Sequence, residues 1–124
     1  MRSPLARAKG LGSAKEGVGH WWHQRLTALA LAPLILWFCT AVARLPGADY
    51  QTLVYWIGLP INAVLLVTLI IVALYHGYLG VQVVMEDYVQ PHWLRTTLII
   101  ISGFAAFLLG LSAIFVVLRL AFEP

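Results

Sequence analysis

The chain has 124 residues, of which 61% are hydrophobic and 10% are charged. Soluble globular domains carry about 25% charged residues, so this balance excludes an ordinary soluble fold and predicts a lipid-embedded protein. The formal net charge is +3, and the single cysteine excludes an intrachain disulfide framework and a cysteine-based metal cluster.

Residues 1–19 form a basic N-terminal segment that is rich in glycine. Such a composition cannot bury a hydrophobic core, so we expect the segment to order only against a partner. The basic residues that precede the first apolar stretch are Arg2, Arg7, Lys9, Lys15 and Arg25. Because positively charged segments stay on the cytoplasmic or matrix side of a membrane, the N-terminus is predicted to lie inside.

Uncharged stretches long enough to cross a bilayer follow this segment. They are Leu26–Ala43, Tyr50–Met85 and Thr96–Leu118. A spanning helix needs about 20 apolar residues, so the second stretch leaves a surplus that calls for an explanation. We expect the first helix to begin near His20, the second to carry Pro60 in or near its first turns, and the third to start after Pro91.

Residues 20–124 are therefore predicted to form one all-α domain, a transmembrane three-helix bundle with its N-terminus inside. A bundle this small encloses little interior, so we expect a second membrane subunit. The third helix is rich in small residues, which permit close helix contact. These residues are Ser102, Gly103, Ala105, Ala106, Gly110, Ser112 and Ala113. They would pack either on that subunit or on the chain's own helices.

His76 is an ionisable residue inside the second stretch, where an unpaired polar group is costly. On a helix, Gly80 and Val83 follow it on the same face, so the surface beside the imidazole is flat. A planar macrocycle could lie there, with the imidazole as an axial ligand of haem iron. Spacing alone favours the alternative, a histidine that hydrogen-bonds across a helix interface.

Asp87 and Tyr88 follow at the inner end of the second stretch. The path from His76 to Asp87 rotates by a net ~20° and rises ~16 Å on a helix, so both residues lie on one face. The phenol could donate a hydrogen bond to a quinone carbonyl, and the carboxylate could orient a basic side chain or pass protons. Position alone favours the alternative, an aromatic-belt tyrosine beside an ordinary helix-end acid.

Cationic residues gather at the same membrane level on the first helix, where His20, His23 and Arg25 lie close together in the sequence. A cluster of this kind suits either the propionates of a haem that lies deeper or phospholipid headgroups.

Two of these motifs resemble a known family, the small hydrophobic membrane anchor of succinate dehydrogenase (succinate:ubiquinone oxidoreductase). The run His76–Val89, HGYLGVQVVMEDYV, is similar to the family signature of a histidine, ten intervening residues and Asp-Tyr. The run His20–Arg25, HWWHQR, is similar to the pattern His-Trp-x-x-Glu/Gln-Arg at the start of the family's first helix. With the order of the motifs and the number of spans, the resemblance covers most of residues 16–118.

The resemblance implies a complex in which a flavoprotein subunit oxidises succinate, an iron–sulfur subunit carries electrons, and two membrane subunits bind haem b and ubiquinone. His76 would ligate the haem iron, and the second axial ligand would come from the larger anchor, a cytochrome b556-type subunit. The chain would hold no catalytic residue and would belong to the enzyme only as its membrane subunit. Its other partner would be the lipid bilayer, and no nucleic acid is expected.

The same resemblance implies roles for the remaining candidates. Tyr88, supported by Asp87, would bind ubiquinone, and His20 and Arg25 would lie near the haem propionates, with His23 as a competing assignment. The location would be a bacterial inner (cytoplasmic) membrane or the mitochondrial inner membrane, which the chain would cross several times.

Other functions stay open. Quinol:fumarate reductases use similar parts in reverse, although the Asp-Tyr ending favours ubiquinone reduction. A monohaem cytochrome could serve another dehydrogenase. A non-redox membrane protein, such as a transporter subunit or an assembly factor, could use His76 and Asp87 as a proton path.

Overall fold

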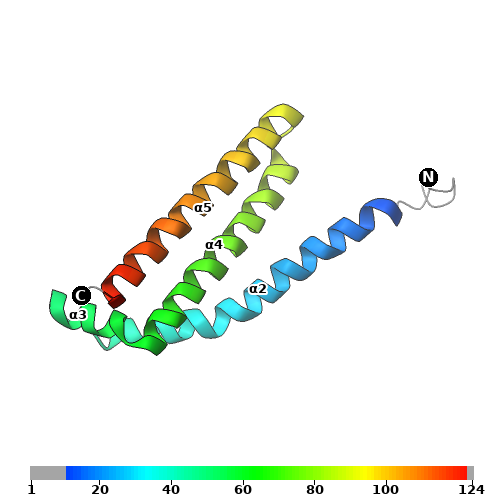
Figure 1. The fold of residues 1–124 in the computed structure, drawn as a ribbon. Helices are drawn as coiled ribbons and strands as arrows, with labels where there is room; N and C mark the ends of the chain where they lie inside the picture. The colour runs from blue at the N-terminus through cyan, green and yellow to red at the C-terminus, as the bar shows by residue number, and fades with distance from the viewer. Residues whose placement is uncertain (1–10, 123–124) are drawn as a thin grey trace.

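The computed structural model describes the backbone of residues 11–122 and the side chains of residues 18–122. This part of the chain forms helices α2 (Leu11–Ala43), α3 (Tyr50–Gly58), α4 (Pro60–Tyr88) and α5 (His92–Phe122), and it contains no strand (Figure 1). The predicted all-α fold is confirmed.

Three of these helices are long and apolar enough to cross a membrane. The candidate spans are Val18–Ala43 with 26 residues, Pro60–Tyr88 with 29 and His92–Phe122 with 31. Each exceeds the ~20 residues that a spanning helix needs, which leaves room for tilt or for ends that project beyond the hydrocarbon. The three predicted spans are thereby confirmed, whereas the orientation of the N-terminus stays a prediction.

The first helix begins earlier than expected, at Leu11 instead of near His20. Residues 11–32 contain no proline, and Ala14, Lys15 and Glu16 favour helix strongly enough to offset the neighbouring glycines. The helix therefore extends into the predicted N-terminal segment, residues 1–19. Residues 1–10 of that segment lie outside the described residues, so its separation from residues 20–124 stays a prediction.

The surplus in the second stretch is a separate short helix, α3. Leu59 is extended between the two helices (φ −65°, ψ 130°), because the ring of Pro60 disfavours helical geometry in the residue before it. Pro60 then starts α4, where its missing N–H costs nothing. The side-chain amide of Asn62 donates to the Trp56 carbonyl over 2.9 Å and ties the end of α3 to the start of α4.

Helix α4 lies between α2 and α5 (Figure 1). Among the described residues, no Cα atom of α2 comes within 8 Å of one in α5. The interior is small, and no described side chain is less than 2% exposed. Large hydrophobic side chains such as Leu29, Ile61 and Phe104 are instead more than half exposed, as expected where a helix faces lipid or another membrane subunit.

Small residues let α5 pack closely on α4. A Cβ atom added to Gly103 would lie 3.3 Å from the Tyr78 ring, and one added to Gly110 would lie 3.1 Å from Leu74 Cδ1. Part of the small-residue face therefore packs within the chain, while Ala105 on the same helix is exposed.

We predict that Gly103→Leu and Gly110→Leu destabilise the α4–α5 pair by about 1–3 kcal/mol each, because the new Cβ atom would already press on the Tyr78 ring or on Leu74 Cδ1. Thermal unfolding of the purified protein in mild detergent measures the effect. Ala105→Leu is the matched control, since it adds a large side chain at an exposed position. Equal unfolding midpoints for all three variants and the original protein would contradict this packing.

Candidate functional site

A polar stripe on α2 faces α4. His20, Gln24 and Thr27 are half-buried and lie at positions i, i+4 and i+7, so they project from one side of the helix. The stripe continues into Leu31 and Leu34, which are buried. Hydrophobic packing therefore sets this face of α2 against α4 and carries the polar residues into the same interface.

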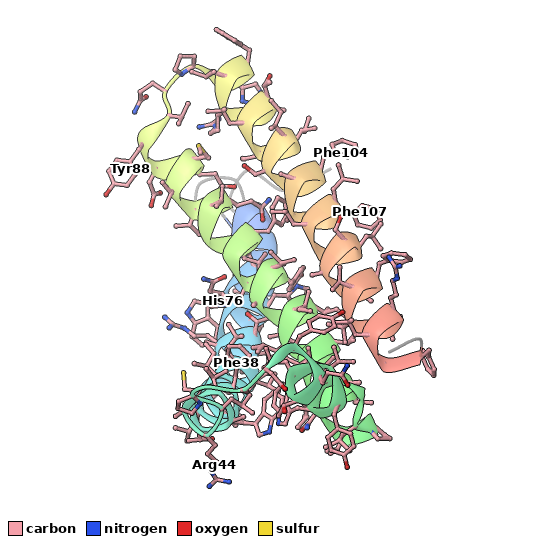
Figure 2. The ribbon with its side chains drawn as sticks, turned by 90° about the vertical axis from the view of Figure 1, so that its left-hand side faces the viewer. Phe38, Arg44, His76, Tyr88, Phe104 and Phe107 are labelled. Carbon is pink, nitrogen blue, oxygen red and sulfur yellow. The ribbon has the colours of Figure 1, made fainter. Side chains whose placement is uncertain are left out.

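His76 contacts this stripe through one ring nitrogen. Its Nδ1 lies 2.8 Å from Thr27 Oγ1, and Figure 2 shows His76 on the side of α4 that meets α2. The Thr27 hydroxyl also lies 2.7 Å from the His23 carbonyl oxygen and 3.0 Å from that of Gln24. Because a carbonyl oxygen can only accept, we assign the single hydroxyl proton to the α2 backbone and the Nδ1 proton to His76, which then donates to Thr27 Oγ1.

This hydrogen bond sets the state of the other ring nitrogen. In a neutral imidazole with the proton on Nδ1, Nε2 keeps a free lone pair, which is the form that ligates metals. The expected alternative was a histidine that hydrogen-bonds across a helix interface, and Nδ1 makes such a bond. It leaves Nε2 available, so the bond and a ligand role are compatible.

A second hydrogen bond joins the same two helices. His23 Nδ1 lies 2.7 Å from the Tyr75 hydroxyl, and both residues are exposed. His23 was the competing candidate for the propionate role of His20. Its Nδ1 is engaged with Tyr75 instead. Neither this pair nor the Thr27–His76 pair was predicted, although the spacing of the polar stripe on α2 could have pointed to Thr27.

A hollow of about 470 Å³ opens beside the stripe, and its wall comes from both helices. The lining residues are His20, Trp21, Gln24, Arg25, Gly80 and Val83. Gly80 lies one turn from His76. Because glycine has no side chain, no group projects from Gly80 into the hollow. The structure thus brings His20 and Arg25 together with the two α4 residues that follow His76 on its face.

Two of the residues that line the hollow each carry a buried polar atom without a partner in the described part of the chain. His20 Nε2 and Gln24 Oε1 are both buried, and neither has a hydrogen-bond partner among the described residues. Leaving such an atom unpaired costs about 1–3 kcal/mol, so a turn of either side chain toward a polar group in the hollow would be favourable. The Arg25 guanidinium lies 5.4 Å from the centroid of the Trp21 ring, which adds positive charge at the rim. His20 and Arg25 therefore make this side of the hollow suitable for acidic groups, whereas Gln24 Oε1 needs a donor.

Asp87 and Tyr88 lie apart from the hollow, at the end of α4. Both are exposed, Tyr88 to 79%, and neither lines the hollow. Figure 2 shows Tyr88 pointing away from the helices. Arg95, the nearby basic residue, donates from Nη2 to His92 Nδ1 over 3.0 Å. Within residues 18–122, Tyr88 is therefore left largely uncovered, as both a quinone contact and an aromatic-belt tyrosine would be.

Comparison with known proteins supports the resemblance seen in the motifs. The family model for the succinate dehydrogenase/fumarate reductase transmembrane subunit matches residues 1–118. The succinate dehydrogenase hydrophobic membrane anchor subunit of Rickettsia bellii is 40% identical over 100 residues, which cover 81% of this chain and 80% of that protein.

Other relatives carry the same name. The subunit from Rickettsia conorii is 39% identical over 102 residues (82% of this chain, 81% of that one), and the subunit from Paracoccus denitrificans is 33% identical over 105 residues (83% and 81%). No solved structure matches the chain. The chain therefore belongs to the succinate dehydrogenase/fumarate reductase transmembrane subunit family.

Proposed function

We propose that this chain is the hydrophobic membrane anchor subunit of a succinate dehydrogenase and that it helps to bind haem b and ubiquinone there. The observation that carries the proposal is the face between α2 and α4. On it, a histidine with a free Nε2 lies one helical turn from a hollow with a cationic, partly unpaired polar wall.

In this proposal, the chain supplies one axial ligand and part of the surroundings of the haem. His76 Nε2 ligates the iron, and the haem, when bound, carries single electrons. Gly80 leaves space for the flat ring, while His20 and Arg25 give the propionates charge-assisted hydrogen bonds. Gln24 Oε1, which can only accept, would pair with a protonated propionate or with water.

The proposed function requires other subunits. A single imidazole leaves one axial position of the iron to be filled, for which we propose a second, cytochrome b556-type anchor. Succinate oxidation and electron delivery are assigned to a flavoprotein subunit and an iron–sulfur subunit, so this chain is not catalytic alone. The small interior and the exposed apolar helix faces support association within the membrane.

Tyr88 is proposed to donate a hydrogen bond to a ubiquinone carbonyl, with Asp87 in support. Its exposure supports this role, because a phenol that residues 18–122 leave 79% exposed can meet a substrate bound between subunits. The Asp-Tyr ending also favours ubiquinone reduction over the reverse direction.

We predict that His76→Leu removes the sharp reduced band of a b-type haem from membranes that contain the assembled complex, because the iron loses a ligand. Succinate oxidation with a soluble dye should survive better than quinone reduction. His92→Leu is the matched control, since His92 is exposed and bonds only locally to Arg95. An unchanged haem spectrum in the His76 variant would refute the ligand assignment.

Tyr88→Phe is expected to lower quinone reductase turnover by about tenfold or more. One decade in rate corresponds to ~1.4 kcal/mol, which is about the value of a hydrogen bond to an oxygen that gains negative charge. The haem spectrum and succinate-to-dye activity should stay unchanged. Tyr55→Phe, at the 71% exposed Tyr55 of α3, provides the control. If both variants reduce ubiquinone at the original rate, Tyr88 is an aromatic-belt residue.

The location proposed for the chain is the bacterial inner membrane or the mitochondrial inner membrane, with the N-terminus inside. A reporter fused after Glu123 should then read as periplasmic or intermembrane, and one inserted between Gln90 and Pro91 as cytoplasmic or matrix. The reverse pattern would place His20, Arg25 and Tyr88 on the outer side and contradict electron delivery from inside.

A further inference from the structure

We propose that Thr27 is a positioning residue for His76 and that its hydroxyl group lowers the reduction potential of the haem iron. This inference rests on the proposed function, because it takes His76 as the axial ligand. Thr27 belongs to neither of the motifs that carry the family resemblance, since it lies two residues beyond the His20–Arg25 run.

The position of the Thr27 oxygen is fixed by its own helix. The hydroxyl donates to the His23 carbonyl oxygen, one turn earlier, over 2.7 Å. A threonine on a helix has few side-chain conformations, and this bond selects one of them. In that conformation Oγ1 lies 2.8 Å from His76 Nδ1, within the half-buried interface of α2 and α4.

Acceptance of the Nδ1 proton has two consequences for a ligand. It holds the imidazole in the tautomer whose Nε2 can bind iron, and it restricts rotation of the ring. It also makes Nε2 more basic, since a hydrogen-bonded N–H leaves more electron density on the ring. A more basic ligand stabilises oxidised iron over reduced iron, so the Thr27 bond lowers the potential.

The neighbouring bond between His23 and Tyr75 offers an internal comparison. It joins the same two helices, from the α4 residue next to His76, over 2.7 Å, but it does not touch the His76 ring. A role of Thr27 in helix packing alone would make the two bonds equivalent. If Thr27 acts through the imidazole, only loss of the Thr27 bond should change the reduction potential of the haem iron.

Potentiometric titration of the haem band in the assembled complex tests the proposal. Thr27→Val keeps the shape but removes the hydroxyl, and we expect a shift of the midpoint potential to more positive values. Haem affinity should fall by about tenfold, as is typical when a partner of a metal ligand is lost. Thr27→Ser restores a hydroxyl and should return both properties toward the original values.

Further variants cover the other outcomes. Tyr75→Phe should leave the potential unchanged, and an equal shift there would overturn the proposal in favour of helix packing. Thr27→Ala should repeat the valine result, which covers the case in which the valine complex fails to assemble. If both Thr27→Val and Thr27→Ala keep the midpoint potential of the original protein, the proposal is also overturned.

The same titration separates this inference from the proposed function. If His76→Leu retains the haem, the ligand assignment fails and the Thr27 proposal fails with it. If His76→Leu loses the haem while Thr27→Val keeps its affinity and potential, the ligand assignment stands and only the role of Thr27 is refuted.

Discussion

The arrangement of this chain depends on how polar side chains find partners at membrane depth. An unpaired polar group is costly there, because no water can replace a missing hydrogen bond. Thr27 with His76, and His23 with Tyr75, satisfy four such side chains between α2 and α4. These short bonds tolerate little sliding, so they help the packing of Leu31 and Leu34 to fix the register of the two helices. The hollow follows from that register, since it places Gln24 opposite Gly80.

The two sides of α4 consequently make contacts of different chemistry. Toward α2 it presents an imidazole and a glycine gap, and the interface holds polar atoms, some of them without partners among the described residues. Toward α5 the contact is apolar: Leu74 and Tyr78 lie against Gly110 and Gly103, and a hollow of about 490 Å³ with an almost entirely apolar lining opens beside them. The apolar side can hold α4 in place without hydrogen bonds. The polar side can then leave part of its wall unfilled for a ligand.

The sequence predicted what depends on a single helix. Hydropathy located the three spans because a bilayer sets both their length and their composition. Helical periodicity put Gly80 and Val83 on the face of His76. A hydrogen bond from His76 across a helix interface was one of the two alternatives considered, but its partner was not predicted, because periodicity says which residues share a face and not which helix meets that face or at what height. The start of α2 at Leu11 was missed because hydropathy marks the apolar span and not the helix that extends beyond it.

The surroundings of Tyr88 could be predicted less well than those of His76, since the described part of the chain leaves Tyr88 exposed. Along α4, the order is His76, the hollow at Gly80 and Val83, and then Asp87 and Tyr88, which lie ~16–18 Å farther along the helix axis than His76. In the proposed assignment, this rise separates a haem within the membrane from a quinone at its inner edge. The His76 end is partly built by α2, whereas Tyr88 is 79% exposed. A haem contact can therefore be argued from one chain, but a quinone pocket requires the walls of its partners.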